Sequence, residues 1–241
     1  MSGHSKWATI HRQKGIKDAK KGAVFTKLAG AIVVAVKAGG GGDPDQNFRL
    51  RLAGEKARQF NMPKDNIARP IEKGTGSEGG ADLTEVMYEG FLPGGAGVLI
   101  EAVTDNKVRT AQTVRSILDK AGGNMAGNGA VSHMFNHEGE VRFKIQNSRS
   151  NEEQELEAID LGINDINDDD GSWVVYCDKD KTFEIKDKLE KMGYEVESAE
   201  LVMRPTTMVD IGSDELRERV ERILEQLEDL DDVHRVWSNY A

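Results

Sequence analysis

The sequence has little cysteine and no long hydrophobic run. Cys177 is the only cysteine among 241 residues, so an intramolecular disulfide cannot form and nothing indicates an oxidising compartment. The longest uncharged apolar run, residues 28–36 (LAGAIVVAV), is far shorter than the roughly 20 residues that a membrane-spanning helix needs. The charged segment before it is too long for the first region of a signal peptide. We therefore expect a cytoplasmic protein that has no membrane partner.

Sequence signatures of common enzyme active sites are also missing. The chain contains no G-x-S-x-G elbow, no G-x-x-x-x-G-K-[ST] loop and no H-E-x-x-H helix. A G-x-G-x-x-G string occurs at Gly74, Gly76 and Gly79, but dinucleotide binding requires a strand before it and a helix after it. A predicted helix precedes the string here, so we interpret it as part of a linker over residues 74–82.

The histidines and the cysteine do not favour a metal or nucleophile site. His133 and His137 have a spacing that binds metal on a helix, but their segment has the pattern of a strand or loop. His4 and His11 stand among basic residues, which oppose a cation. Cys177 ends an apolar strand pattern with no obvious His or Arg helper, so we interpret it as a small buried apolar residue. We expect no catalytic residue, no metal, no cofactor and no small-molecule substrate.

Charge is distributed very unevenly along this acidic chain. Residues 1–75 contain 15 Lys or Arg and 6 Asp or Glu, a net charge of 15 − 6 = +9. Residues 76–241 hold the other 17 basic and 36 acidic residues, a net charge of 17 − 36 = −19. This asymmetry indicates a basic module for a polyanion, joined to an acidic body that repels one. The acidic surfaces would remain available to a protein partner.

Residues 1–80 show helical periodicity. The first apolar face consists of residues three and four apart: Phe25, Leu28, Ile32 and Val36. It ends at four glycines, 39–42, and an Asp-Pro pair then opens a second helix. The second helix has its own apolar stripe: Leu50, Ala53, Ala57 and Phe60. A third helix is predicted from Pro63 to Lys73, and Pro70 inside it should kink or shorten the helix because it lacks an N–H.

Beyond residue 82 strand-like and helical patterns alternate. Strands are predicted at residues 86–91 and 97–103. The helix after them has this apolar set: Val108, Ala111, Val114, Leu118 and Ala121. A glycine-rich loop covers residues 122–131. From residue 140 the order strand, helix, strand, strand, helix, strand is that of a ferredoxin-like domain. The acidic run at residues 168–170 is interpreted as a solvated turn.

Residues 207–241 are predicted to belong to the domain that begins at residue 82. This segment contains a strand at residues 207–211, a helix started by Ser213 and a short strand at residues 233–237. The apolar stripe of that helix consists of Leu216, Val220, Ile223, Leu227 and Leu230. We predict an α/β (α+β) fold of three domains, the third inserted into the second: 1–80, basic and helical; 82–138 with 207–241, α/β and discontinuous; and 139–206, ferredoxin-like.

The basic residues of the first segment form a cluster: Lys6, Arg12, Lys14, Lys17, Lys20, Lys21 and Lys27. Phosphate backbones attract such clusters through the release of counterions, a strong term that does not depend on base sequence. A solvated helix face is the plain alternative. Trp7 adds either a surface on which a base can stack or a hydrophobic anchor.

Long motifs occur along the whole chain. They are GHSKWATI, KDAKKG, FTKL, GGGGDPDQNFRLRLA, KARQFNMPKDNI, EKGTG, YEGFLPGG, TDNKVRTAQTVR and AVSHMF. These motifs resemble the YebC family, bacterial relatives of the mitochondrial translational activator of cytochrome c oxidase subunit I. The resemblance implies a non-catalytic, three-domain α/β regulator. Family members are commonly described as DNA-binding transcriptional regulators, whereas others are assigned to translation on the ribosome.

Both assignments require a surface that binds nucleic acid. The resemblance places it on Lys6, Trp7, Arg12, Lys14, Lys17, Lys20, Lys21, Lys27, Arg49, Arg51, Lys56, Arg58 and Lys64. In the ribosomal alternative, the loop at residues 124–129 would reach into RNA through Asn124, Met125 and Asn128. No helix-turn-helix is recognisable, which favours recognition of backbone and shape over base reading. We expect the basic side chains to share one outward surface.

Overall fold

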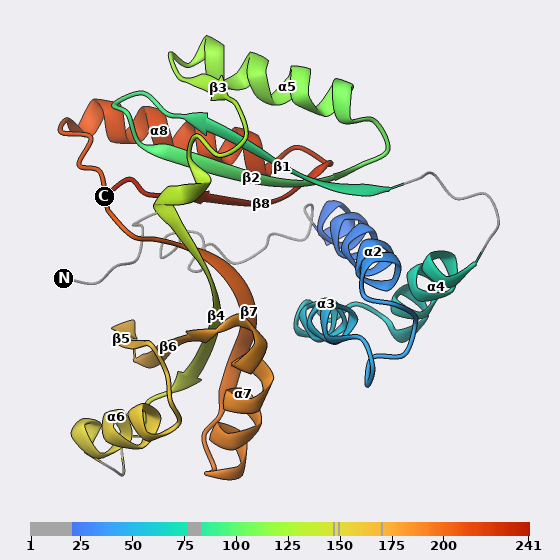
Figure 1. The fold of residues 1–241 in the computed structure, drawn as a ribbon, viewed down its shortest axis with the longest axis vertical. Coiled ribbons are helices and arrows are strands. Elements are labelled where there is room, and N and C mark those ends of the chain that lie inside the picture. The colour runs from blue at the N-terminus through green and yellow to red at the C-terminus, as the bar shows by residue number, and fades with distance from the viewer. Residues whose placement is uncertain (1–20, 77–82, 147, 149, 170) are drawn as a thin grey trace. The chain divides into compact units, whose positions relative to one another are not determined.

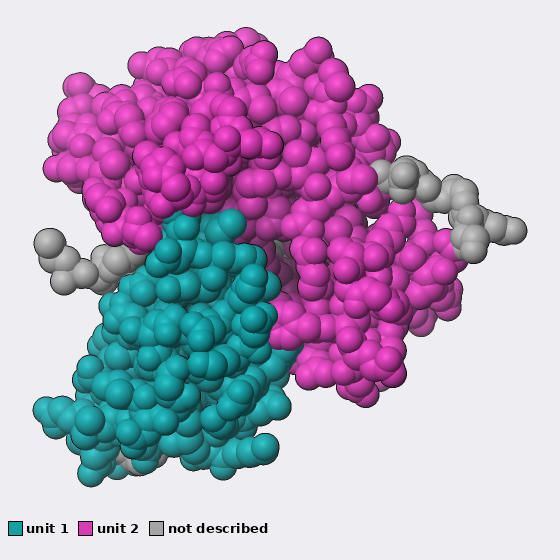
Figure 2. All heavy atoms as spheres, in the orientation of Figure 1, with its two compact units in different colours: residues 1–2, 135–204 teal, residues 3–134, 205–241 magenta. Residues whose placement is uncertain are grey.

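The computed structural model describes residues 21–76, 83–146, 148, 150–169 and 171–241, which fall into two compact units (Figures 1 and 2). Unit 1 is Phe135–Arg204, and unit 2 comprises the described residues up to Met134 together with Pro205–Ala241. Unit 1 is therefore an insertion into the chain of unit 2. None of the helices in the described ranges has both the length and the apolar character needed to cross a membrane.

The described part of unit 2 begins with three helices that pack on one another (Figure 1). They are α2 (Lys21–Ala38), α3 (Phe48–Gln59) and α4 (Lys64–Thr75). Their shared core has these fully buried members: Leu28, Ile32, Ala35, Val36, Leu50, Ala57 and Met62. Both apolar stripes predicted from the sequence point into this core, since Phe25, Ala53 and Phe60 pack against it as partly buried residues. The helical interpretation of the described part of this region is confirmed.

The predicted start of the second helix is wrong, and so is the predicted shortening of the third helix at Pro70. The second helix begins at Phe48 and is capped by Asn47, not by the Asp-Pro pair upstream. The buried Asn47 side chain accepts a hydrogen bond from the Leu50 N–H and donates to the carbonyl oxygens of Ala35 and Gly41. Pro70 does not shorten α4, which continues to Thr75.

The other part of unit 2 is a four-stranded sheet of order β3-β1-β2-β8. Its strands are β1 (Thr84–Phe91), β2 (Gly97–Thr104), β3 (Asn124–Ala126) and β8 (Val233–Ser238). Helices α5 (Lys107–Lys120) and α8 (Asp214–Glu228) cover one face of this sheet, and the core lies between (Figure 1). Apolar residues from strands and helices meet there: Tyr88, Val98, Ile100, Val114, Leu118, Val220, Leu224 and Leu227.

The sequence pattern fails at two places in this sheet domain. Val108 belongs to the predicted apolar set of α5 but is 67% exposed in the first turn of that helix. The predicted strand at residues 207–211 is reduced to a single parallel bridge between Val209 and Tyr240. The α8 stripe is confirmed, with Val220, Ile223 and Leu227 buried against the sheet.

Unit 1 has the predicted ferredoxin-like plan. Its elements are β4 (Phe135–Lys144), α6 (Asn151–Asp160), β5 (Asp165–Asp169), β6 (Ser172–Asp178), the short η3 (Lys179–Lys181), α7 (Thr182–Lys191) and β7 (Val196–Pro205). The sheet order is β5-β6-β4-β7, so the first and third strands of the unit lie in the centre. Both helices contribute to the core that lies on one face of this sheet.

The acidic run of unit 1 is not a solvated turn. Asp168 and Asp169 belong to β5, and Asp170 lies outside the described residues. The Arg142 guanidinium lies 2.5 Å from an Asp169 carboxylate oxygen, and it also donates to Glu197 at 2.9 Å. Arg142 comes from a strand 27 residues away in the sequence, so this ion pair could not be seen in the local pattern.

Cys177 is fully buried, as the sequence indicated. Burial raises the pKa of its thiol to about 11, so the reactive thiolate is scarce at neutral pH. We expect an aromatic disulfide reagent at pH 8 to leave the folded protein unmodified and to react with one thiol after unfolding in urea. Rapid stoichiometric reaction of the folded protein would contradict this placement.

Candidate nucleic-acid interface

Six predicted contact residues lie outside the described residues: Lys6, Trp7, Arg12, Lys14, Lys17 and Lys20. The same holds for His4 and His11. Lys21 is the first residue of α2. The geometry of the candidate interface therefore comes from the basic side chains of α2, α3 and α4.

Exposed basic residues occur at the end of α3 and along α4. Arg58 and Lys64, both predicted from the sequence, are exposed and are separated by one short connection. Arg69 and Lys73 are also exposed, and their spacing of four residues places them on one face of α4. Within the described part of the chain we find no ion pair to any of these four side chains. They are free to contact phosphates.

Sequence reasoning missed Arg69 and Lys73 as contact residues. Both belong to the basic excess of residues 1–75, and they flank Ile71, which packs into the helical core. A helical wheel of the third predicted helix would have placed them opposite its apolar side. The exposed basic residues at the end of α3 and on α4 are therefore Arg58, Lys64, Arg69 and Lys73; this set is called here the α3–α4 basic face, and Arg69 and Lys73 share one side of α4.

Other predicted contact residues are held by groups of unit 2. Arg49 Nη2 lies 2.5 Å from a carboxylate oxygen of Glu85 at the start of β1. Arg51 donates to the carbonyl oxygens of Pro44 and Asp45 at 3.1 Å each. The Lys27 ammonium donates to the carbonyl oxygen of Glu228, the last residue of α8. The predicted basic residues therefore divide into an exposed group and a group with internal partners.

The boundary between α2 and the sheet contains several ionisable groups. His234 lies at a bulge of β8, with its ring 3.4 Å from where a Cβ of Gly30 would stand. Burial, aided by the positive charges of Lys27 and Arg235, lowers the pKa of His234 to about 4, so the ring is neutral at pH 7. Glu101 lies opposite Arg235 in the β2–β8 pair, and burial raises the pKa of its carboxyl.

The predicted RNA-reaching loop is partly a strand. Asn124 and Met125 belong to β3, which pairs with β1, and Met125 packs against the sheet core. Asn124 and Asn128 are exposed. Gly123 is required at the start of this segment, because a Cβ there would lie 2.4 Å from the carbonyl oxygen of Phe91.

Glu89 organises the rest of this loop from the neighbouring strand. Its carboxylate is only 5% exposed and accepts hydrogen bonds from the backbone N–H groups of Gly129, Val131 and Ser132, at 2.8, 2.6 and 3.0 Å. Burial alone would raise the pKa of Glu89, but these hydrogen bonds to the charged form outweigh it and lower the pKa. Glu89 is therefore ionised at neutral pH. His133 is exposed in a short helical turn after the loop, with Nδ1 3.2 Å from the Gly129 carbonyl oxygen.

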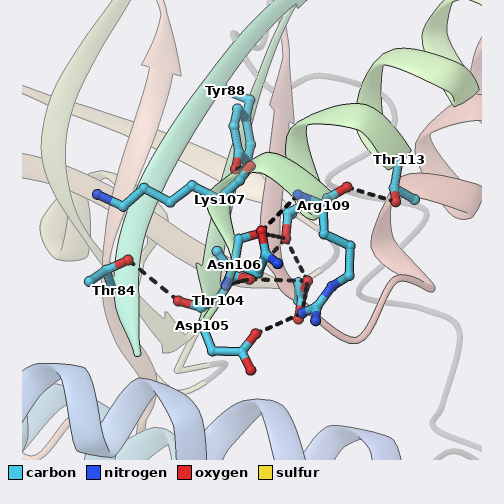
Figure 3. A network of polar contacts seen from close by, with 10 residues as sticks. Thr84, Tyr88, Thr104, Asp105, Asn106, Lys107, Arg109 and Thr113 are labelled. Carbon is cyan, nitrogen blue, oxygen red and sulfur yellow. Dashed lines mark hydrogen bonds and ion pairs between the residues drawn. The ribbon is translucent and has the colours of Figure 1, made fainter. Parts of the chain in front are cut away.

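The TDNKVRT motif forms a polar network at the start of α5 (Figure 3). Asn106 caps the helix by accepting from the Arg109 N–H, and the buried Thr104 hydroxyl accepts from the Asn106 N–H at 2.9 Å. Asp232, just before β8, accepts from the Thr110 hydroxyl at 2.6 Å and from Arg109 at 3.1 Å. These contacts outweigh the effect of burial and lower the pKa of Asp232. The motif joins β2, α5 and β8.

We expect Asp232→Ala to lower the free energy of unfolding by about 1–3 kcal/mol, because it removes the carboxylate that accepts hydrogen bonds from the hydroxyls of Thr104 and Thr110 and from Arg109. Asp105→Ala is the matched control, since it removes an exposed partner of the same arginine and should cost less than about 1 kcal/mol. Urea unfolding of both variants checks this. Equal losses would mean that the network contributes no more than its exposed ion pair.

The described geometry defines a mixed α/β protein with a basic helical region followed by two sheet domains, one inserted into the other. Comparison with known proteins identifies it further. Residues 5–77 match the TACO1/YebC protein N-terminal domain, and residues 83–240 match the TACO1/YebC second and third domain. The chain belongs to the TACO1/YebC family.

Its relatives are similar over nearly their whole length. A "probable transcriptional regulatory protein" of Chloroflexus aurantiacus is 46% identical over 99% of this chain and 95% of its own length. One of Lactiplantibacillus plantarum is 44% identical over 100% of this chain and 99% of its own length. The crystal structure of the conserved hypothetical protein Aq1575 from Aquifex aeolicus is 38% identical with a TM-score of 0.88, covering 98% of this chain and 97% of that one.

Proposed function

We propose that this protein is a cytoplasmic, non-catalytic regulator of gene expression that binds nucleic acid through its basic N-terminal region, as a DNA-binding transcriptional regulator. The α3–α4 basic face carries the proposal, because its four cations are exposed and unpaired among the described residues. Residues 1–75 have a net charge of +9 and the rest of the chain has −19. This difference supports binding of a polyanion by the N-terminal region and not by the acidic remainder. The names of the relatives agree with a role in transcription.

Salt dependence of binding tests this proposal. If about six phosphates of a DNA duplex are neutralised, the logarithm of affinity should fall with the logarithm of salt concentration at a slope near −5. Fluorescence anisotropy with a labelled 20-base-pair duplex between 50 and 200 mM salt, about the range over which such contacts respond, measures the slope. A slope near zero would refute a phosphate-binding surface.

Ribosomal RNA is the alternative target. Backbone recognition by lysine and arginine suits structured RNA as well as DNA, and the loop ordered by Glu89 presents the exposed Asn128 between two glycines. In this alternative the protein is a ribosome-associated translation factor. Gradient sedimentation of a cell lysate separates the two: comigration with ribosomal particles that is lost after RNase treatment favours translation.

A further inference from the structure

Basic side chains of the helical region contact negatively charged or carbonyl groups of the sheet domain within unit 2. Arg49 is paired with Glu85 of β1, and Lys27 donates to the last carbonyl of α8. A helix C-terminus carries negative partial charge, so the Lys27 contact is also electrostatic. Lys56 is close enough to Glu101 of β2 to favour its ionised form. Two predicted phosphate-binding cations, Arg49 and Lys27, are thus held by negative groups of the same chain, and the charge of Lys56 acts on a third such group.

The contact between α2 and the sheet is only partly apolar. Gly30 of α2 approaches Val103 of β2, whereas Glu101, His234 and Arg235 introduce polar and charged groups on the same side of the sheet. Charged groups at a contact lose hydration, so such a contact is less stable than an apolar one of equal area.

We propose that this sheet face is an internal competitor for polyanions. When α2 and α3 are in contact with the sheet (the docked form), Glu85 binds Arg49 and the last carbonyl of α8 binds Lys27. A nucleic-acid phosphate must displace these partners to reach the two cations. The docked form is then the low-affinity form, and affinity is set by a contact within the chain. This inference rests on the proposed function and adds regulation to it.

A double-mutant cycle on Arg49 and Glu85 tests the competition. Glu85→Gln removes the carboxylate charge without changing its size, and it should raise affinity for the labelled duplex by up to about fivefold, the range of an exposed ion pair. Arg49→Gln should then cost more affinity in the Glu85→Gln background than in the wild type, because Arg49 is released there. Glu72→Gln, an exposed carboxylate of α4, is the matched control and should leave the effect of Arg49→Gln unchanged.

A large side chain at Gly30 tests internal competition without changing the charge of the protein. A Cβ at Gly30 would already lie 3.4 Å from His234 and 3.6 Å from Val103, so Gly30→Leu should push α2 away from the sheet. Affinity should rise at least about threefold, because a larger fraction of molecules is undocked. Gly22→Leu is the control, since nothing lies within 4 Å of a Cβ there.

The outcomes separate the two proposals. If the effects of Arg49→Gln and Glu85→Gln on affinity are additive and Gly30→Leu binds the duplex like the wild type, the internal-competition proposal is refuted. The proposal of nucleic-acid binding is not affected by that result. If neither the wild type nor any variant shows salt-dependent binding, the proposed function fails and internal competition fails with it. Circular dichroism melts of every variant establish that the comparisons are made on folded protein.

Discussion

Replacement of Glu89 by Ala is expected to lower the free energy of unfolding by about 2–4 kcal/mol, because three buried or partly buried N–H groups lose the carboxylate to which they donate. Glu89→Gln should be nearly as costly, since an amide has one acceptor oxygen and its NH2 group would face backbone donors. Urea unfolding at pH 7 measures both. The control is Glu85→Gln in the same strand, whose exposed ion pair should contribute less than about 1 kcal/mol.

The Glu89 contribution should depend on pH with a definite sign. Because folding lowers the pKa of this carboxyl below its ordinary value of 4.5, its stabilisation is fully present above that value. The stabilisation is lost as pH falls toward the lower pKa of the folded state. The difference in unfolding free energy between wild type and Glu89→Gln should therefore be constant from pH 6 to 8 and shrink below about pH 4.5. A difference that grows in acid would mean that Glu89 is protonated in the folded protein.

Charge reversal on the α3–α4 basic face is expected to have the largest effect on binding. If Arg69 and Lys73 each contact one phosphate, Arg69→Glu with Lys73→Glu should weaken duplex binding by roughly 50-fold or more at 0.1 M salt. The salt slope should become less negative by about 2 × 0.9, or about 1.8. Anisotropy titrations at several salt concentrations measure both quantities.

A matched double reversal distinguishes local contact from net charge. Lys179→Glu with Lys191→Glu changes the charge by the same amount in unit 1, where both lysines are exposed. This control should leave the salt slope unchanged and reduce affinity far less. Equal losses from the two double variants would show that only total charge matters, and the α3–α4 basic face would have no special role.

The fold could be predicted from the sequence wherever apolar residues recur at a regular spacing, because that spacing marks the buried side of a helix or strand. The stripes of α2, α3 and α8 and the continuous apolar run of β2 lie in the cores, and their spacing directly reflects helical or strand geometry. The ferredoxin-like order followed from the same patterns. Local periodicity failed where distant partners matter: Asn47 caps α3 while its amide donates to the end of α2, and the acidic side chain of Asp169 in β5 is paired with Arg142 of β4.

The candidate site could be only partly predicted from the sequence, because distant residues also determine its contacts. Arg58 and Lys64 were identified by type and motif, and both are exposed. Arg49 was identified on the same grounds, yet it is paired with Glu85, 36 residues further along the chain. Glu89 looked like one more polar residue of a strand, since its loop partners lie 40 to 43 residues away. Sequence shows which side chains can bind an anion, but tertiary partners decide which of them remain available.

Two residues of unit 2 on either side of the inserted unit 1 are in direct contact. The Thr206 N–H donates to the Met134 carbonyl oxygen at 2.8 Å, and the Thr206 hydroxyl donates to the same oxygen at 3.0 Å. Closing a loop whose ends already touch adds little entropic cost, whatever the length of chain between them. We therefore expect that the inserted ferredoxin-like unit can be replaced by another domain whose ends are equally close together, because the sheet of unit 2 keeps its strand order on either side of the insertion.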